Sequence, residues 1–181
     1  MALSMKNPGL EIRTATEADV AIVLSFIKKL AAYEKLQHEV VASETLLRET
    51  LFTAVKSAEA AIGFLDGAPV GFVIYFYNYS TFLARRGIYI EDLYVDEDFR
   101  GRGVGRALLI HVARLAYQRG CGRLEWAVLD WNLPAIQFYK HLGAVPMSDW
   151  TVFRLTDKAL AKLAAEHSDP AVLTVSPNNK E

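Results

Sequence analysis

The chain has 181 residues, a formal net charge of −1 and one cysteine. This length is typical of one domain with a substantial core. A near-neutral charge argues against nucleic acid as a main partner, because no basic excess exists to neutralise phosphates. One cysteine permits no internal disulfide, and the sequence has no apolar run of membrane-spanning length and no signal pattern. We therefore expect a cytosolic protein with no membrane partner.

The first half of the chain predicts two helices set among strands. Thr16, followed three residues on by Asp19, has the spacing of a capping box, and apolar residues from Val20 keep helical spacing to Tyr33. Ser43 is expected to cap a second helix that runs through residue 52. The expected strands are 10–13, 58–65, 70–77 and 88–95, with a hairpin turn at 66–69 and a loop at 78–87.

The second half predicts helices and strands in mixed order. Apolar residues from Val104 to Ala116 share one face of a helix that ends at glycines 120 and 122. The further elements expected are a strand at 123–129, a helix at 134–142, a strand at 144–155 and a helix from 157. This order predicts a three-layer α/β/α sandwich on a mixed sheet. Residues 1–167 are expected to form one domain, and 168–181 a poorly ordered tail.

The turn after the predicted strand 88–95 reads Arg100-Gly101-Arg102-Gly103-Val104-Gly105-Arg106. Three glycines at alternate positions let backbone amides approach a ligand closely. Those amides open a helix, where unpaired N–H groups and the positive end of the dipole converge. With three arginines beside them, they indicate a phosphate or pyrophosphate site. A tight chain reversal with surface arginines is the alternative.

Two nucleotide-binding motifs do not fit this turn. A Walker loop requires Lys followed by Ser or Thr, and the turn has neither pair. A dinucleotide fingerprint requires glycine where Arg106 stands, although Glu125 lies about twenty residues on, where that motif places an acid. The spacing that fits is Arg-x-x-Gly-x-Gly, read as Arg100, Gly103 and Gly105.

This spacing resembles the acetyl-CoA pyrophosphate loop of the Gcn5-related N-acetyltransferases. Further stretches resemble one branch of them, the spermidine/spermine and thialysine N-acetyltransferases: they are 30–34 (LAAYE), 89–95 (YIEDLYV), 131–140 (WNLPAIQFYK) and 143–144 (GA). The resemblance spans about residues 12–160. It implies a sheet whose two central parallel strands splay apart where acetyl-CoA enters, and a homodimer to which strand 144–155 contributes. The implied reaction is acetyl transfer to a primary amine.

The resemblance also implies where the cofactor binds. The turn at 100–106 would hold the pyrophosphate, and the backbone of Leu93, Tyr94 and Val95 would face the pantetheine arm and the thioester carbonyl. Asn132 would contact the pantetheine, although it is also placed to cap the helix at 134–142. The four histidines show no ligand spacing, so we expect no metal.

Tyr139 is, on the resemblance, the candidate general acid at the coenzyme A sulfur. It stands mid-helix, seven residues after Asn132. A phenol is protonated at neutral pH yet able to donate to a strongly basic thiolate. The alternative is a core tyrosine packed beside Phe138. Cys121 has no histidine nearby in the sequence, so we do not expect it to carry the acyl group.

Glu34, Glu91 and Asp92 are the acids expected to hold the amine. Glu34 ends a helix, where a negative charge faces the unfavourable end of the dipole, although an ordinary exposed glutamate is the alternative. Glu91 and Asp92 interrupt an apolar strand, and because side chains alternate, one of them must point to the covered face. A buried acid needs a partner, either an arginine or a cationic substrate. We favour Glu91 as the substrate-facing acid, acting as base directly or through water.

Tyr33, Phe82 and Trp150 are candidate walls for an aliphatic amine, with core packing the alternative for Trp150. Where the polyamine enzymes carry an acid and a tryptophan before the glutamate strand, this chain has Ser80 and Phe82. The missing acid leaves a diamine or lysine-like substrate as well supported as a polyamine. Two other functions stay open: a protein or peptide acetyltransferase for lysine or an N-terminus, and a non-catalytic acyl-CoA-binding sensor.

Overall fold

The computed structural model describes residues 8–166. The chain divides into two compact units, Met1–Leu129 and Asp130–Glu181, and each is described by itself. The tail predicted at 168–181 lies outside the described residues.

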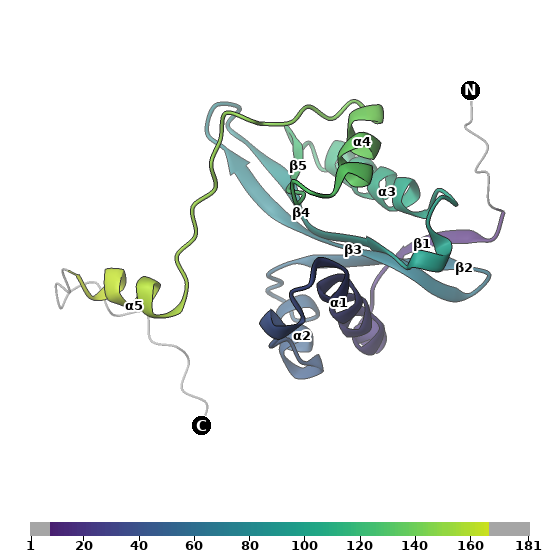
Figure 1. The fold of residues 1–181 in the computed structure, drawn as a ribbon, viewed down its shortest axis with the longest axis horizontal. Coiled ribbons are helices and arrows are strands. Elements are labelled where there is room, and N and C mark those ends of the chain that lie inside the picture. The colour runs from purple at the N-terminus through teal and green to yellow at the C-terminus, as the bar shows by residue number, and fades with distance from the viewer. Residues whose placement is uncertain (1–7, 167–181) are drawn as a thin grey trace. The chain divides into compact units, whose positions relative to one another are not determined.

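The first unit is built on a five-stranded sheet in the order β1-β2-β3-β4-β5 (Figure 1). Neighbouring strands from β1 to β4 run antiparallel, while β4 and β5 run parallel, so the sheet is mixed, as predicted. The strands are β1 (Leu10–Thr14), β2 (Glu59–Leu65), β3 (Ala68–Ser80), β4 (Arg85–Val95) and β5 (Leu124–Trp126).

Helices cover both faces of this sheet, which confirms the layered α/β architecture. In Figure 1, α1 (Val20–Glu34) and α2 (Glu44–Leu51) lie on one face and α3 (Val104–Gln118) lies on the other. Short 3-10 turns at η1 (Glu17–Asp19), η2 (Gln37–Glu39) and η3 (Glu97–Phe99) connect these elements. We call the side under α1 and α2 the α1 face.

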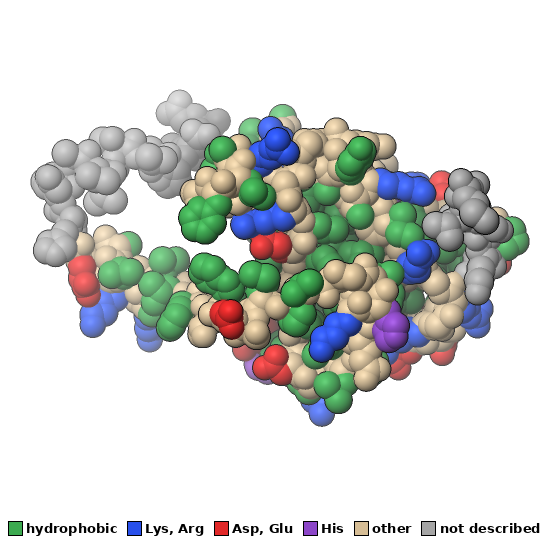
Figure 2. All heavy atoms as spheres, turned by 90° about the horizontal axis from the view of Figure 1, so that it is seen from above, with side chains coloured by type: hydrophobic (Ala, Val, Ile, Leu, Met, Phe, Trp, Pro, Cys, Tyr) green, Lys and Arg blue, Asp and Glu red, His purple; other side chains and the backbone are tan. Residues whose placement is uncertain are grey.

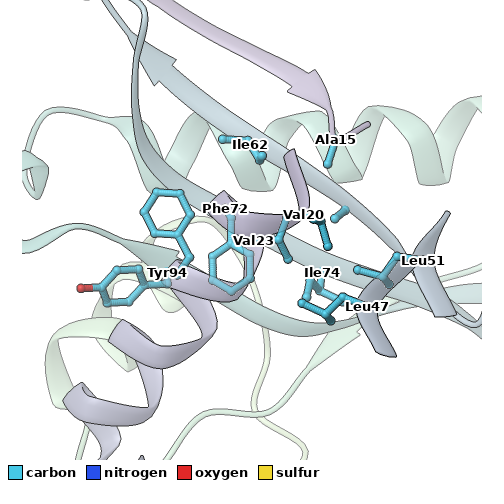
Figure 3. Packing of buried hydrophobic residues seen from close by; sticks show 11 residues of the cluster. Ala15, Val20, Val23, Leu47, Leu51, Ile62, Phe72, Ile74 and Tyr94 are labelled. Atoms are coloured by element: carbon cyan, nitrogen blue, oxygen red, sulfur yellow. The ribbon is translucent and has the colours of Figure 1, made fainter. Parts of the chain in front are cut away.

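The core of the α1 face is a cluster of apolar side chains from both helices and three strands. Phe26 of α1 stacks on Phe72 of β3, with ring centres 5.4 Å apart, and lies 6.1 Å from the ring of Tyr94 on β4. Figure 3 shows the helix side chains turned toward the strands. Each such side chain contributes about 1.5–3 kcal/mol of burial free energy, so this cluster holds α1 against the sheet. Its other labelled members are Ala15, Val20, Val23, Leu47, Leu51, Ile62 and Ile74.

The predicted helix starts are confirmed by their hydrogen bonds. Asp19 accepts bonds from both the amide and the hydroxyl of Thr16, each at 2.8 Å, and from Arg13 at 2.7 and 2.8 Å. The Arg13 guanidinium holds the pKa of the Asp19 carboxyl far below its usual range. The Ser43 hydroxyl accepts a bond from the Leu46 amide at 3.3 Å and so caps α2.

The loop predicted at 78–87 is wrong. Strands β3 and β4 continue through it, with Asn78 opposite Gly87 and Ser80 opposite Arg85, and only residues 81–84 turn. Polar and glycine residues here suggested a loop, but the ladder that starts in the core extends along both strands. The hairpin is therefore long, and its tip lies far from the core.

Two predicted strands also differ from the structure. The strand expected at 123–129 has only three residues, Leu124–Trp126, and the one expected at 144–155 does not form. A strand requires a hydrogen-bonded neighbour, and the second unit offers none at residues 130–166. Between α4 (Leu133–His141) and α5 (Asp157–Ala165) the segment 145–155 exposes large apolar side chains, Phe153 at 91% and Val152 at 85%. Figure 2 shows hydrophobic side chains along it, at the left of the view.

Candidate active site

The glycine turn presents backbone amides at the N-terminus of α3. Gly101 and Gly103 have φ values of 73° and 82°, the left-handed region that favours glycine, and a Cβ at either would meet nothing within 4 Å. The Ala107 amide is the first to bond within the helix, to the Gly103 oxygen at 3.0 Å. The amides at 104–106 precede it and have no helical carbonyl to bond, so they can receive an anion.

Gly105 differs from the other two glycines of the turn. It lies in the first turn of α3 with an ordinary helical backbone, and a Cβ there would make only an ordinary contact, 3.5 Å from Cγ2 of Val95. Neither strain nor crowding within the described residues requires glycine here. A ligand that lies close to the backbone would require it.

The second half of β4 has a strand neighbour on one edge only. Its pairing with β3 runs to Val95, but its pairing with β5 ends at Ile90 opposite Trp126. Strand β5 itself ends at Trp126, so residues 91–95 of β4 have no strand on that edge. Leu93, Tyr94 and Val95 therefore lie where an extended ligand can meet a strand edge. The Tyr94 side chain itself is buried in the core of the α1 face.

A β-bulge at Glu91 decides which acid faces α1. Asp92 lies opposite Ile74 and Ile90 lies opposite Tyr75, so Glu91 is the extra residue on β4. Opposed residues share a face, and Ile74 belongs to the core under α1. Asp92 therefore points to the α1 face and is half-buried, whereas Glu91 is exposed. This corrects the preference for Glu91 on the covered face.

Three carboxylates interact at this end of the sheet. Burial raises the pKa of Asp92 to about 6, and the charges of Glu91 and Glu34 add to the rise. Burial also raises the pKa of Glu34, the last residue of α1. The exposed-glutamate alternative for Glu34 does not hold, because its side chain is half-buried. A cation placed here would offset both the burial and the repulsion.

The aromatic residue before Glu34 joins this cluster to the glycine turn. The guanidinium carbon of Arg100 lies 4.5 Å from the centre of the Tyr33 ring and 5.7 Å from that of Tyr94. Arg102 instead lies over Phe99, at 5.2 Å from the ring centre. The two arginines thus contact different aromatic rings. Their positions in the sequence did not predict this difference.

The structure does not bring Phe82 or Ser80 to the three carboxylates. Phe82 lies at the hairpin tip and is 95% exposed. The tip is seven residues along β4 from Asp92, roughly 23 Å at about 3.3 Å per residue. The Ser80 hydroxyl is buried and accepts a bond from the Leu83 amide at 3.3 Å, so it holds the turn.

In the second unit, Asn132 stands directly before α4 and Tyr139 lies in its second half. Asn132 caps α4 by accepting a bond from the Ala135 amide at 3.3 Å. The Tyr139 ring lies 5.3 Å from the ring of Phe138, and burial raises the pKa of its phenol to about 12. Trp150, in the same unit, is 72% exposed, which excludes core packing for it.

One further acid, Glu125, lies on β5, and the sequence did not indicate it for the amine site. Glu125 of β5 lies beside Tyr89 of β4 and is held by Asn78 at 2.7 Å and Arg123 at 2.8 Å. Its charge is thus already partnered. Within residues 8–166 no cluster of His, Cys, Asp and Glu is arranged to hold a metal, and no helix has the length and apolarity needed to cross a membrane.

Comparison with known proteins decides the family. The model of the acetyltransferase (GNAT) family matches residues 28–144, which contain the glycine turn, all three carboxylates and Tyr139. The chain belongs to the GNAT family.

Two relatives are named as N-acetyltransferases of ornithine and of thialysine. The chain is 37% identical over 166 residues to thialysine N-epsilon-acetyltransferase of Bos taurus, covering 86% of this chain and 97% of the relative. It is 33% identical over 194 residues to L-ornithine N5-acetyltransferase NATA1 of Arabidopsis thaliana, covering 82% of this chain and 85% of the relative. This GNAT protein is an acetyl-CoA-dependent N-acetyltransferase.

The fold agrees with solved structures. An integron cassette protein from the mobile metagenome of V. cholerae superposes with a TM-score of 0.73 at 25% identity, over 87% of this chain and 98% of that one.

Proposed function

We propose that this enzyme transfers the acetyl group of acetyl-CoA to a primary amine of a small polyamine, diamine or lysine-like substrate, directly and in a ternary complex. The observation that carries the acceptor class is the group of Glu34, Glu91 and Asp92, in which burial, and then the charges of Glu91 and Glu34, raise the pKa of Asp92. Such a group is stabilised by an ammonium. Relatives named for N5 of ornithine and N-epsilon of thialysine support a lysine-like acceptor.

The fit of the chain to acetyl-CoA rests on the glycine turn and the strand edge. The amides at 104–106, with Arg102 and Arg106 beside them, would hold the pyrophosphate, and Gly105, which neither strain nor crowding explains, lets it lie close to the backbone. The backbone of residues 93–95 would receive the pantetheine arm, with Asn132 as a further contact. Acetyl-CoA, when bound, supplies the acetyl group as a thioester.

Proton transfer is assigned to the acids and to Tyr139. The amine must lose a proton before it attacks, and Glu91 or Asp92 would accept that proton directly or through a water. As the new C–N bond forms and the C–S bond breaks, the Tyr139 hydroxyl would donate its proton to the sulfur. A phenol whose pKa is raised to about 12 stays protonated at neutral pH and is ready to donate. The nitrogen gives up its second proton as the intermediate collapses, and that proton restores the Tyr139 hydroxyl through water. The amide and free coenzyme A thiol are the products.

Two further parts of the proposal concern assembly and location. We propose a homodimer in which the segment 144–155 contributes to the shared surface, because its exposed apolar side chains lack a strand partner in the described unit. A cytoplasmic location is proposed from the composition and the single cysteine.

The acceptor site is tested by Glu34→Gln. Removing one carboxylate should raise the Michaelis constant for dicationic amines several-fold more than for monocationic amines, because the second ammonium loses its partner. The exposed Glu49 on α2 provides the control, since Glu49→Gln removes equal charge elsewhere. An equal change for all amines would show that Glu34 does not hold the substrate.

A further inference from the structure

The side chain of Arg100 contacts residues outside the glycine turn. Its guanidinium lies over Tyr33 and Tyr94, its Nε donates to the Val95 oxygen at 3.1 Å, and its Nη1 lies 3.5 Å from a carboxylate oxygen of Glu97. The guanidinium is thus held by α1, by the end of β4 and by η3. A side chain engaged in this way is poorly placed to serve mainly as a pyrophosphate ligand.

Tyr33 is the residue through which Arg100 reaches the amine site. It stands in the last turn of α1, directly before Glu34, and α1 ends at Lys35 with a left-handed φ of 62°. The amides of Lys35 and Leu36 donate to the Ala32 and Ala31 oxygens at 3.2 and 2.8 Å and close this last turn, but these bonds do not join it to the sheet. A cation over the Tyr33 ring fastens this last turn to β4.

We propose that Arg100 is a positioning residue for the amine site rather than a ligand of the cofactor. By holding the Tyr33 ring, it holds the last turn of α1 and so keeps Glu34 close to Asp92. The same side chain belongs to the turn that would bind the pyrophosphate, so the turn and the amine site are mechanically connected. This inference rests on the proposed function, because it assigns Glu34 and Asp92 to the acceptor amine.

A pair of arginine variants tests the assignment. Arg100→Met removes the cation and the Nε donor but keeps an unbranched chain, and Arg102→Met removes the same charge from the same turn. At saturating acetyl-CoA, Arg100→Met should raise the Michaelis constant for the amine about three- to tenfold, with kcat changed less than about twofold. Its acetyl-CoA dissociation constant by calorimetry should stay within about twofold. Arg102→Met should weaken acetyl-CoA binding and leave the Michaelis constant for the amine unchanged.

A double-mutant cycle tests whether the effect passes through the ring of residue 33. In a Tyr33→Phe background, which keeps the ring face, Arg100→Met should produce its full effect. In a Tyr33→Leu background, Arg100→Met should change the Michaelis constant for the amine by less than about twofold, because the contact between residue 100 and the ring is already lost. The same four proteins can be compared by their free energies of unfolding. This measures the coupling between residues 33 and 100 even where a variant is poorly active.

The outcomes separate cleanly. If Arg100→Met weakens acetyl-CoA binding at least tenfold and leaves the Michaelis constant for the amine unchanged, Arg100 is a cofactor ligand and the inference is overturned. An equal effect in the Phe and Leu backgrounds overturns it as well. If the wild-type protein acetylates no amine, the proposed function fails, while the cycle in unfolding still decides whether Arg100 holds α1 through Tyr33. Should Arg100→Met not fold, Arg100→Lys enters the same comparisons.

Discussion

Single residues in the glycine turn carry the argument for the cofactor. Gly101 and Gly103 are explained by their left-handed backbone alone, so their presence says little about a ligand. Gly105 has ordinary helical geometry and ordinary space around a Cβ, so a nearby ligand is the reason that remains among the described residues. For this reason Gly105 is a better position than Gly103 for testing the site, since a substitution at Gly103 would also strain the backbone.

Gly105→Glu should weaken acetyl-CoA binding at least tenfold, about 1.4 kcal/mol, as measured by calorimetry. The carboxylate would stand among the amides meant for the pyrophosphate. It should not unfold the helix, because an acid in the first turn interacts favourably with the dipole. Ala113→Glu, exposed farther along α3, is the control for added charge, and Gly105→Ala is the control for bulk. Unchanged affinity in Gly105→Glu would remove the basis for a cofactor site at this turn.

Tyr139→Phe should lower kcat by about a hundredfold or more while leaving coenzyme A affinity nearly intact. The ring and its contact with Phe138 remain, and only the donor is lost. Steady-state kinetics with saturating acetyl-CoA measure the effect, and thermal unfolding checks the packing. If turnover stays within a factor of a few, Tyr139 is structural and another donor protonates the sulfur.

At the scale of elements, the bulge in β4 sets the chemistry of the acidic group. Strand alternation would have put Asp92 on the same face as Ile90, under α3. The extra residue Glu91 reverses the alternation, so Asp92 lies under α1 with Ile74. A single inserted position thereby brings a strand acid and the end of a helix to one place.

Asp92→Asn should stabilise the fold at pH 7.5 and not at pH 4. The folded protein holds the Asp92 proton more tightly than the unfolded chain does, since its pKa rises from 3.8 to about 6. Stability is therefore lost as the pH rises through this window, by on the order of 2–3 kcal/mol. Asn cannot ionise and avoids that loss, so the melting temperature at pH 7.5 should rise by about 5 °C or more.

The contrasting variant is Glu91→Gln, which removes an exposed charge next to Asp92 and leaves the half-buried Asp92 in place. Its melting temperature at pH 7.5 should rise by less than that of Asp92→Asn, because the Glu91 charge is only a secondary cause of the raised pKa of Asp92, after burial. If Asp92→Asn raises the melting temperature equally at both pH values, the ionisation of Asp92 is not what destabilises the fold.

Local signals were predictable from the sequence, whereas contacts between distant segments were not. The Thr16–Asp19 cap, the Ser43 cap and the glycine turn depend on residues a few positions apart, and all three form as predicted. The bulge at Glu91 depends on the register of β4 against β3, which no local pattern specifies. The Arg100–Tyr33 contact joins residues 67 positions apart and became visible only when α1 was placed over β4.

At the scale of the whole molecule, the segment 144–155 is the feature that a single chain leaves unexplained. The sequence has strand character there, yet the structure shows an exposed, unpaired segment with apolar side chains. An apolar surface of this kind is typical of an interface between chains.

Light scattering should therefore give twice the chain mass of 20.2 kDa, about 40 kDa. Replacing Val152 and Phe153 together by aspartate should shift the mass toward the monomer, because two charges cannot be buried in an apolar interface. The matched change at Val55, equally exposed in the first unit, should leave the mass unchanged. A wild-type mass near 20 kDa would rule out the homodimer.

The most direct test of the proposed activity is acetyl transfer itself. The purified protein is incubated with acetyl-CoA and a panel of lysine analogues, diamines, spermidine, spermine and a lysine-containing peptide, and thiol release and product mass are followed. We predict thiol release with a singly acetylated small amine as product, and little with the peptide. Transfer to the peptide alone, or tight acetyl-CoA binding with no transfer to any amine, would contradict the assignment of a small-amine N-acetyltransferase.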